Sequence, residues 1–442
     1  MTAVRIANDP PSDDQVTVSA SPAKSYDLVN RAACATSLTR VPSSYDRVVV
    51  GAGILGLAVA REVLVRRPET RLIVVDQAPT VGAHQTSHNS GVIHAGVYYA
   101  PGSLKARLCV RGAALMYEYC ERHEIEADRI GKLIIATDAG ELPGLDELER
   151  RARANGVPGI RRIHAGQIRE IEPHATGIAA LHSPNTGIID FRKVCEQLAT
   201  DVREAGGELR LGWPVSDVQA NARQIRLVGP DGDGIEAAGA VFCAGLSADR
   251  LAVRAGASPD PRIVPFRGGY LRLRAERRGV VKGLIYPVPD PALPFLGVHL
   301  TPQIGGEVVL GPTALLVGAR DAYSLATVRA SDLADTFAWP GTWRMMRRWW
   351  KTGLHELHLA ASRRAFAAHA ARYVPELTAN DMSKGFAGVR AQAVGRDGKL
   401  VDDFVISRTP RAVHVRNAPS PAATSSLALA AEIADSADEH LA

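Results

Sequence analysis

Three glycines and one aspartate at fixed spacing are the first residues in this sequence whose types could serve chemistry. Gly51, Gly53 and Gly56 form the pattern G-x-G-x-x-G, and Asp76 follows twenty residues after the last glycine. Such glycines permit a tight turn, let the backbone approach a pyrophosphate, and let a helix pack closely on a strand. An acid at this distance suits the free 2′-hydroxyl of an adenosine ribose. These residues therefore predict a dinucleotide site, for either NAD or FAD.

The elements around the glycines are those that position such a site. Residues 48–50 are all valine, which is typical of a strand buried on both faces. A helix is expected from Ile54, because Ile54, Leu57 and Ala58 begin an apolar stripe. Residues 72–75 predict a second buried strand. The glycines alone could mark only a sharp turn, but this order of strand, turn, helix and strand favours a nucleotide site.

Bulk properties restrict the class of protein. The 442 residues are 46% hydrophobic and 22% charged, which indicates a soluble globular chain. The net charge of +5 does not imply a nucleic-acid partner and is compatible with an anionic substrate or a membrane surface. Five scattered cysteines without a C-x-x-C pair indicate a reduced, cytoplasmic protein with neither disulfide framework nor metal site.

The length and the recurrence of strand–helix patterns predict two domains. Dinucleotide-type patterns occur near the start, near residue 240 and near the end. We therefore expect an α/β fold (α+β in its two domains), in which a discontinuous Rossmann-like nucleotide domain carries an inserted substrate domain of antiparallel sheet and helices. The expected boundaries are 45–125, 176–258 and 385–442 for the nucleotide domain, and 126–175 and 259–384 for the substrate domain. Residues 1–44 lack periodicity and predict a disordered N-terminal extension or an upstream extension of the reading frame.

No second G-x-G-x-x-G follows a strand. Enzymes that reduce a flavin with NAD(P)H usually carry two such units. The reductant is therefore expected to be the substrate itself.

Three later stretches closely resemble one family. They are HQTSHNSGVIHAGVYYAPGSLKARLC (84–109), PFRGGYLRL (265–273) with LIYPVPDPALPFLGVHLT (284–301), and GVRAQAV (388–394) with DGKLVDDF and NAPSPAATSS (417–426). Together they resemble the FAD-dependent L-2-hydroxyglutarate oxidases and dehydrogenases of the D-amino-acid-oxidase-like (DAO) flavoprotein superfamily, from about Tyr45 to near the C-terminus. The resemblance implies FAD as cofactor and a hydride passed from C2 of L-2-hydroxyglutarate to flavin N5, giving 2-oxoglutarate. The resemblance does not decide whether a quinone or oxygen is the electron acceptor.

Two positions depart from the family pattern. Asp76 stands where a Glu is common, and Gly269 replaces the Glu of PFRGEY. The second departure keeps another substrate open, namely a different anionic 2-hydroxy acid or an amino acid. A flavin-binding protein without catalysis is a third reading.

The glycine motif and the resemblance together assign FAD contacts to four segments. The small residues after position 88 let backbone lie against a flat ring system, and the last segment aims N–H groups of a helix start at the flavin pyrimidine. The expected cofactor-binding residues are Gly51, Gly53, Ile54, Leu55, Gly56, Asp76 and Gln77; Thr86, Ser87, His88, Asn89, Ser90, Gly91 and Val92; Cys243, Ala244 and Gly245; and Pro419, Ser420, Pro421, Ala422, Ala423 and Thr424.

The chemistry implied by the resemblance needs a base. Oxidation of a 2-hydroxy acid removes a proton from the hydroxyl, and histidine is the usual acceptor near neutral pH. His94 and His299 are the candidates, because both lie in the family-like stretches.

A dicarboxylate substrate requires paired cations, and arginine binds carboxylate with two parallel hydrogen bonds. Arg267 and Arg390 stand among small and apolar residues, so each is expected to bind one carboxylate. Tyr99 and Tyr270 are expected either to donate further hydrogen bonds or to pack.

A tryptophan-rich stretch, WPGTWRMMRRWWKTGL, allows two interpretations. Aromatic and basic residues interleaved on a helix suit the headgroup layer of an anionic membrane, which would bring the protein to the inner face of the cell membrane and near a quinone. Alternatively, Trp343, Met346 and Trp350 form one buried face of an ordinary packed helix. The sequence leaves the oligomeric state open.

Overall fold

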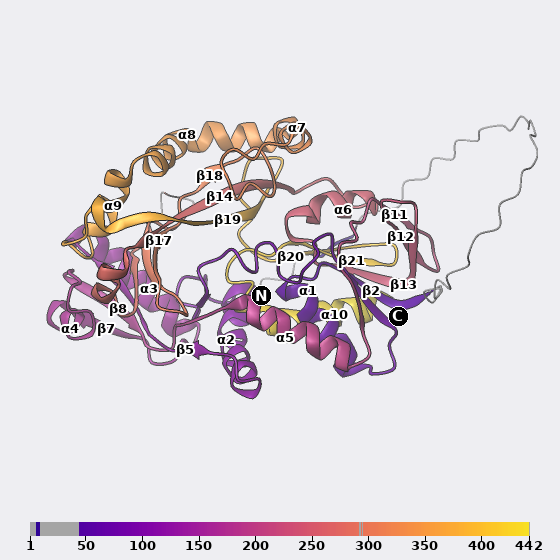
Figure 1. The fold of residues 1–442 in the computed structure, drawn as a ribbon, viewed down its shortest axis with the longest axis horizontal. Helices are drawn as coiled ribbons and strands as arrows, with labels where there is room; N and C mark the ends of the chain where they lie inside the picture. The colour runs from indigo at the N-terminus through magenta and orange to yellow at the C-terminus, as the bar shows by residue number, and fades with distance from the viewer. Residues whose placement is uncertain (1–5, 9–43, 291–292, 294, 442) are drawn as a thin grey trace, which may run out of the picture.

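Two large β-sheets divide the chain into two lobes, which lie side by side in Figure 1. The computed structural model describes residues 6–8, 44–290, 293 and 295–441. One lobe contains the glycine motif and the C-terminal helix, and the other is built mainly from the middle of the chain. This architecture confirms the predicted α/β class with an inserted second lobe.

The first sheet has the parallel core of a nucleotide-binding fold. β2 (Tyr45–Val50) lies between β13 (Gly234–Phe242) and β3 (Leu72–Val75), and the three strands run parallel. β3 is buried at every position, as its run of apolar residues predicts. The sheet order is β1 (Ile6–Asn8), β20 (Val405–Thr409), β21 (Ala412–Asn417), β13, β2, β3 and β10 (Glu208–Arg210), with β11 (Asp217–Ala220) and β12 (Ile225–Val228) added to β13 as a hairpin.

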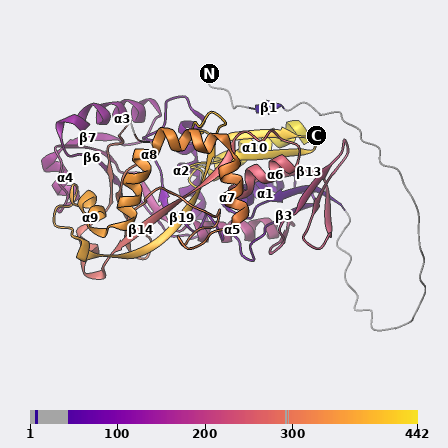
Figure 2. The same cartoon turned by 90° about the horizontal axis from the view of Figure 1, so that it is seen from above.

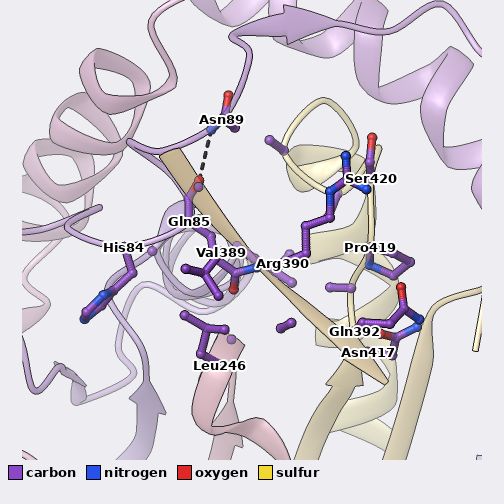
Figure 3. Close-up of a pocket in the computed structure, with 18 of the residues that line it drawn as sticks. His84, Gln85, Asn89, Leu246, Val389, Arg390, Gln392, Asn417, Pro419 and Ser420 are labelled. Atoms are coloured by element: carbon purple, nitrogen blue, oxygen red, sulfur yellow. Dashed lines mark hydrogen bonds between the residues drawn. The ribbon is translucent and has the colours of Figure 1, made fainter. Parts of the chain in front are cut away.

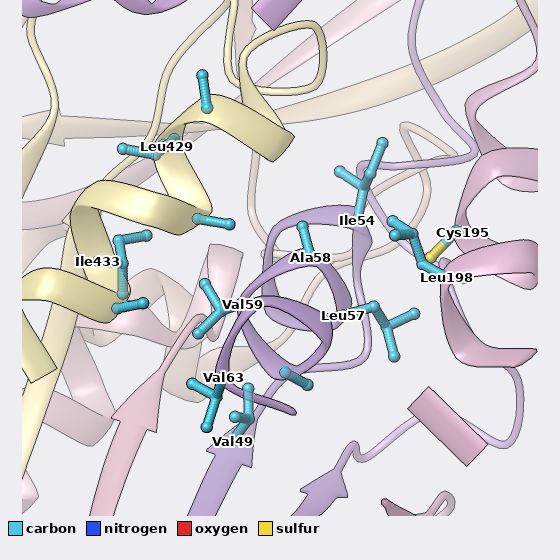
Figure 4. Packing of buried hydrophobic residues seen from close by; sticks show 14 of the residues in the cluster. Val49, Ile54, Leu57, Ala58, Val59, Val63, Cys195, Leu198, Leu429 and Ile433 are labelled. Carbon is cyan, nitrogen blue, oxygen red and sulfur yellow. The ribbon is translucent and has the colours of Figure 1, made fainter. Parts of the chain in front are cut away.

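Helix α1 (Ile54–Arg66) begins at the glycine turn and packs between two other helices. α5 (Phe191–Glu204) covers one side of it and α10 (Ser426–Leu441) the other (Figure 4). Leu57 and Val59 of α1 are fully buried, and Leu→Ala at such a position costs about 2–5 kcal/mol. The C-terminal helix therefore holds the glycine turn in place from the opposite end of the sequence.

The second sheet is mainly antiparallel. Its two longest strands, β14 (Arg262–Leu273) and β19 (Met382–Val394), pair along almost their full length. β6 (Lys132–Ala136) and β15 (Leu284–Pro287) form a parallel pair within it. The order is β18 (Leu315–Leu316), β14, β17 (Val308–Gly311), β16 (His299–Pro302), β15, β6, β8 (Ala179–Ser183) and β7 (Arg161–His164), with β19 also paired to β14.

Two stretches expected in the nucleotide domain supply strands to this second sheet. β8 lies within the segment 176–258, and most of β19 lies within 385–442. The boundaries at 176 and 385 therefore differ from the sheet topology. A short apolar strand does not reveal its sheet, because that depends on partners distant in sequence.

The remaining elements connect the two lobes or cover them. A small third sheet contains β4 (Val92–Ile93), β9 (Gly187–Ile189) and β5 (Ala127–Asp128). The other helices are α2 (Leu104–Arg122), α3 (Leu142–Ala154), α4 (Ala165–Ile171), α6 (Ala248–Arg254), α7 (Ala330–Ala338), α8 (Pro340–Ala361) and α9 (Arg363–Ala371).

The tryptophan-rich stretch lies on α8, which runs along the outer edge of the molecule (Figures 1 and 2). The expected buried face of this helix is wrong: Trp343, Met346 and Trp350 are 56%, 36% and 57% exposed. Met345 and the partly buried Trp349 of this helix pack in the cluster that contains Val264 and Phe266 of β14, so Trp343, Met346 and Trp350 face outward. No helix in the described part of the chain is long and apolar enough to span a bilayer.

Of the N-terminal extension, the structure describes Ile6–Asn8 and Ser44. Ile6–Asn8 forms β1, which pairs parallel with β20 at the edge of the first sheet. The sequence did not predict this strand, because three residues joined to a sheet edge show no periodicity. The predicted disorder of residues 1–5 and 9–43 lies outside the described residues.

Candidate active site

One cavity of about 2020 Å³ is lined by residues of both lobes. Pockets for drug-sized ligands usually measure roughly 300–1,000 Å³, so this cavity has room for a dinucleotide and a second small molecule. It extends from the glycine turn to His94, His299 and Arg390. Figure 3 shows the part in which Arg390 extends toward the loop that carries Ser420.

The glycine turn forms the nucleotide end of this cavity. Gly51 has a φ of +114°, and a side chain there would collide with the carbonyl oxygen of Cys243. A side chain at Gly56 would collide with the carbonyl oxygen of Gly51. Gly53 precedes α1 and lines the cavity together with the first turn of that helix. A helix N-terminus at this position favours a bound anion such as a pyrophosphate.

Side chains fix the turn on either side. Asp76 accepts hydrogen bonds from the backbone N–H groups of Ala52 and Ala78, at 2.6 and 2.8 Å. Its carboxylate is thereby held beside the turn, where it lines the cavity. The Thr86 hydroxyl accepts a hydrogen bond from the N–H of Ile54 at 3.1 Å and so caps α1. This arrangement fits an adenosine ribose and a pyrophosphate.

Two loops more than 300 residues apart meet at the middle of the cavity. The Thr424 hydroxyl accepts a hydrogen bond from the N–H of His94 at 3.1 Å and donates one to the carbonyl of Val92 at 3.2 Å. Asn89 donates hydrogen bonds to the carbonyls of Gln85 and Thr86, at 3.0 and 2.6 Å. The dashed line in Figure 3 marks the first of these. The loops are therefore fixed in position before any ligand binds.

His94 and His299 are brought to the same part of the cavity. The Nδ1 atom of His94 is buried without a hydrogen-bond partner among the described residues. His299 Nδ1 lies 2.9 Å from the Thr301 hydroxyl, and its ring stacks on Tyr286 with 4.0 Å between ring centres. Burial lowers the pKa of both histidines well below the usual value, and the nearby charge of Lys132 acts in the same direction. Both imidazoles are therefore neutral at neutral pH and able to accept a proton.

The two candidate arginines have different environments. Arg390 lines the cavity, with its guanidinium carbon 5.2 Å from the centre of the Phe295 ring. Arg267 does not line it and instead donates a hydrogen bond to the carbonyl of Tyr323 at 3.2 Å. On β14, the residues that line the cavity are Ile263, Gly268 and Tyr270. Arg267 therefore lies outside the cavity lining, and its role as a carboxylate ligand stays a prediction.

Most of the other predicted residues line the cavity. Tyr99 and Tyr270 do so, and among the predicted cofactor-binding residues Ser87 and Gly91 are the two that do not. The hydroxyl of Ser87 donates to the carbonyl of Gly82 at 2.6 Å, and Gly91 packs against Ile189. These two residues shape the loop and do not face the cavity. The cavity-lining ones are Gly51, Gly53, Ile54, Leu55, Gly56, Asp76, Gln77, Thr86, His88, Asn89, Ser90, Val92, Cys243, Ala244, Gly245, Pro419, Ser420, Pro421, Ala422, Ala423 and Thr424.

Sequence reasoning missed Lys132, Tyr98 and Tyr286. Tyr98 and Tyr286 line the cavity, and Lys132 lies against both rings. A lysine at the head of the apolar run KLIIA was the available signal, since lysine is rarely buried without a reason.

Comparison with known proteins agrees with this geometry. Residues 46–436 match the family model described as DAO, FAD dependent oxidoreductase.

The chain belongs to this FAD-dependent oxidoreductase family.

Two curated relatives are similar over nearly their whole length. One is the L-2-hydroxyglutarate dehydrogenase, mitochondrial, of Nematostella vectensis, 44% identical over 421 residues, which cover 91% of this chain and 92% of the relative. The protein of the same name from Homo sapiens is 43% identical over 421 residues, covering 92% and 91%. The structure of L-alpha-glycerophosphate oxidase from Mycoplasma pneumoniae with FAD bound has a TM-score of 0.72 at 21% identity, covering 90% of this chain and 94% of that one, and shows the same fold.

The residues of the nucleotide end fit the cofactor of the family. The glycine turn leaves no room for side chains where backbone must approach a pyrophosphate, and Asp76 is fixed beside it. FAD, when bound, supplies the hydride acceptor of such an enzyme. The backbone segments around His94 and Thr424 border the cavity between this end and Arg390.

Proposed function

We propose that the protein oxidises L-2-hydroxyglutarate to 2-oxoglutarate, with FAD accepting the hydride from C2. One observation carries this proposal: the cavity joins the nucleotide turn to two neutral histidines, the half-buried His94 and the buried His299, and to Arg390. The names of relatives that are 43–44% identical over nine-tenths of the chain support the substrate.

Each side chain has a definite task in this reaction. His94 or His299 accepts the proton of the substrate hydroxyl, for which a neutral imidazole is required. Arg390 binds a carboxylate of the substrate through its planar pair of N–H groups. Tyr99 and Tyr270 donate hydrogen bonds from the cavity wall. Because these groups lie in a largely buried site, they are held in position before substrate enters.

Anaerobic mixing tests the proposal. L-2-hydroxyglutarate is expected to bleach the visible absorbance of the bound flavin, whereas the D-enantiomer is expected to leave it unchanged. Absence of bleaching by the L-enantiomer contradicts the substrate assignment.

A substrate panel tests the alternative, that another anionic 2-hydroxy acid or an amino acid is the substrate. Gly269 keeps this alternative open, because it lacks the carboxylate common at this position. L-malate, L-lactate and L-glutamate are suitable members. Faster flavin reduction by any of them favours the alternative, and reduction by any substrate excludes a non-catalytic flavin protein.

We further propose that electrons pass to a quinone, with oxygen as the alternative, and that α8 contacts the cytoplasmic face of the cell membrane. Trp343, Met346, Trp350, Leu354 and Leu357 are exposed apolar residues on α8, at intervals of three or four residues on the two sides of a kink at Trp349. The exposed basic residues Arg344, Arg347, Arg348 and Lys351 lie between or beside them. Apolar and basic groups on one exposed helix suit an anionic lipid surface.

Vesicle binding tests this contact. The protein is expected to sediment with vesicles of phosphatidylglycerol and phosphatidylcholine, and less so at high salt. Replacing Trp343 and Trp350 by Ser is expected to abolish binding. Ile178→Ser, at a residue 44% exposed outside α8, serves as the matched control. Equal sedimentation of wild type and the double variant contradicts membrane contact through α8.

A further inference from the structure

Lys132 is a buried cation to which the proposed reaction gives no task. It is the first residue of β6 and is 2% exposed. Its ammonium lies 4.1 Å from the centre of the Tyr286 ring and 5.3 Å from that of Tyr98. It forms no ion pair with a carboxylate within the described part of the chain. A buried ammonium without a counter-charge is costly, so its retention calls for an anion.

The position of Lys132 relates it directly to the candidate active site. β16, β15 and β6 are neighbours in the second sheet, and they carry His299, Tyr286 and Lys132 respectively. Tyr286 stacks on His299 and also contacts the lysine. Tyr98 and Tyr286 line the cavity, so the ammonium lies immediately behind the cavity wall.

Among the residues that the structure describes, no group that acts on Lys132 supplies a negative charge. Cys109 is the one acidic group that acts on the lysine, and burial raises the pKa of its thiol to about 12. Burial also raises the pKa values of Tyr98 and Tyr286, and it lowers those of His94 and His299. All five groups are therefore neutral at neutral pH.

Two unpartnered polar atoms occur at the same place. The Tyr98 hydroxyl and His94 Nδ1 are buried and have no hydrogen-bond partner among the described residues. Buried polar atoms are nearly always satisfied in native proteins, so a polar ligand is expected to complete them. Arg390 provides one cation for a dicarboxylate, whereas Arg267 does not line the cavity and donates a hydrogen bond to the carbonyl of Tyr323. Five of the other cations that line the cavity are each paired with a carboxylate: Lys105, Arg151, Arg250, Arg320 and Arg329. Lys132, behind the wall, has no such partner among the described residues and is our candidate for the second cation.

We infer that Lys132 is the second cation of the substrate site and determines its selectivity for dicarboxylates. Its ammonium acts across Tyr98 and Tyr286 on the carboxylate that Arg390 does not hold. The inference rests on the proposed function, because it concerns the second charge of L-2-hydroxyglutarate. Burial lowers the pKa of Lys132 to about 7, so the empty site is only partly charged at neutral pH. A bound dianion favours the ammonium form and is expected to draw a proton from solution.

Steady-state kinetics with two substrates test the inference. The substrates are L-2-hydroxyglutarate and L-2-hydroxyvalerate, which lacks the distal carboxylate. Lys132→Met is expected to raise KM for the dicarboxylate about tenfold, as for an attraction between two charges that aromatic rings separate, and to leave KM for the monocarboxylate within about threefold. Lys132→Arg is expected to retain most of the selectivity. Lys282→Met, at an exposed position just before β15, is the control for loss of one lysine charge.

Two outcomes overturn the inference: an unchanged KM for both substrates, and an equal rise for both, which would indicate a structural role. A second readout uses the wild-type holoprotein, in case Lys132→Met does not fold. Calorimetric titration with glutarate slightly above neutral pH, in buffers of different ionisation enthalpy, is expected to show net proton uptake. Absence of uptake overturns the inference. Failure of wild type to be reduced by L-2-hydroxyglutarate is a separate result, which contradicts the proposed function and leaves the glutarate titration valid.

Discussion

The two ends of the cavity are built in different ways. At the nucleotide end, backbone is fixed by residues close in sequence, from Gly51 to Asp76 and Thr86. At the substrate end, single side chains come from distant segments: His94 from a loop, His299 from β16 and Arg390 from β19. Holding a cofactor depends on where glycines allow backbone to approach, whereas selecting a substrate depends on which side chains face the cavity. Mutations at the nucleotide end should therefore impair FAD binding, whereas mutations at the substrate end should impair turnover or substrate binding.

The largest effect is expected at the nucleotide end from Gly51→Ala. The added carbon collides with the carbonyl oxygen of Cys243, so the turn must shift and FAD binding should be lost. Gly256→Ala is the matched control, because Gly256 has a φ of +90° but no atom within 4 Å of the added carbon. The flavin absorbance of the purified variants measures the difference. Normal FAD content in Gly51→Ala would show that the turn is not the cofactor anchor.

At the substrate end, loss of the base should spare cofactor binding and reduce turnover. His94→Gln and His299→Gln are each expected to retain FAD, and the variant that removes the base is expected to lower kcat about 10²- to 10⁴-fold. Rapid-mixing measurement of flavin reduction identifies which one it is. Near-normal reduction rates in both variants would exclude histidine as the base.

The same histidines predict the pH dependence. Burial lowers their pKa values well below 6.5, so the neutral, proton-accepting form persists as pH falls through the usual titration range of histidine. We expect kcat/KM to show no acidic limb near pH 6.5 and to decline only at clearly lower pH. An acidic limb at the ordinary histidine pKa would mean that the catalytic base is exposed or paired with a carboxylate.

Substitution of Arg390 and of Arg267 is expected to have a smaller effect than loss of the base, and the two substitutions test which residues of the substrate end bind substrate. Arg390→Met is expected to lower kcat/KM about 10²-fold, because a bidentate charged contact is lost. Arg267→Met should alter stability without changing KM, since Arg267 does not line the cavity and donates a hydrogen bond to the carbonyl of Tyr323. The two variants, on neighbouring strands, thus distinguish an effect on substrate binding from an effect on folding stability. Equal losses of kcat/KM in both variants would contradict a substrate role for Arg390 alone.

The comparison also explains what the sequence could reveal. The nucleotide-binding unit can be predicted from sequence because its glycines, strands and acid lie within about thirty residues, and local spacing determines their geometry. The sequence could not show whether Arg267 lines the cavity, because a strand changes face at every residue and its register with β19 depends on pairing over 120 residues away. Lys132 was missed for the same reason, since only the order of β16, β15 and β6 brings it beside Tyr286 and His299.

The smallest effect is expected from Thr86→Ala at the nucleotide end. This change removes the hydroxyl that caps the N–H of Ile54, which costs about 1 kcal/mol of stability and should weaken FAD binding up to roughly tenfold. Thermal unfolding and FAD titration measure both quantities. A change in KM at full FAD occupancy would show that a residue of the nucleotide end also affects substrate binding, which contradicts the division between the two ends.

A crystal structure with FAD and 2-oxoglutarate is the most direct test of the division between the two ends. We expect the pyrophosphate against the glycine turn from Gly51 to Gly56, one carboxylate of 2-oxoglutarate on Arg390, and its keto group within hydrogen-bonding reach of His94 or His299. Binding of 2-oxoglutarate with both carboxylates away from Arg390, or with its keto group remote from both histidines, would contradict the account.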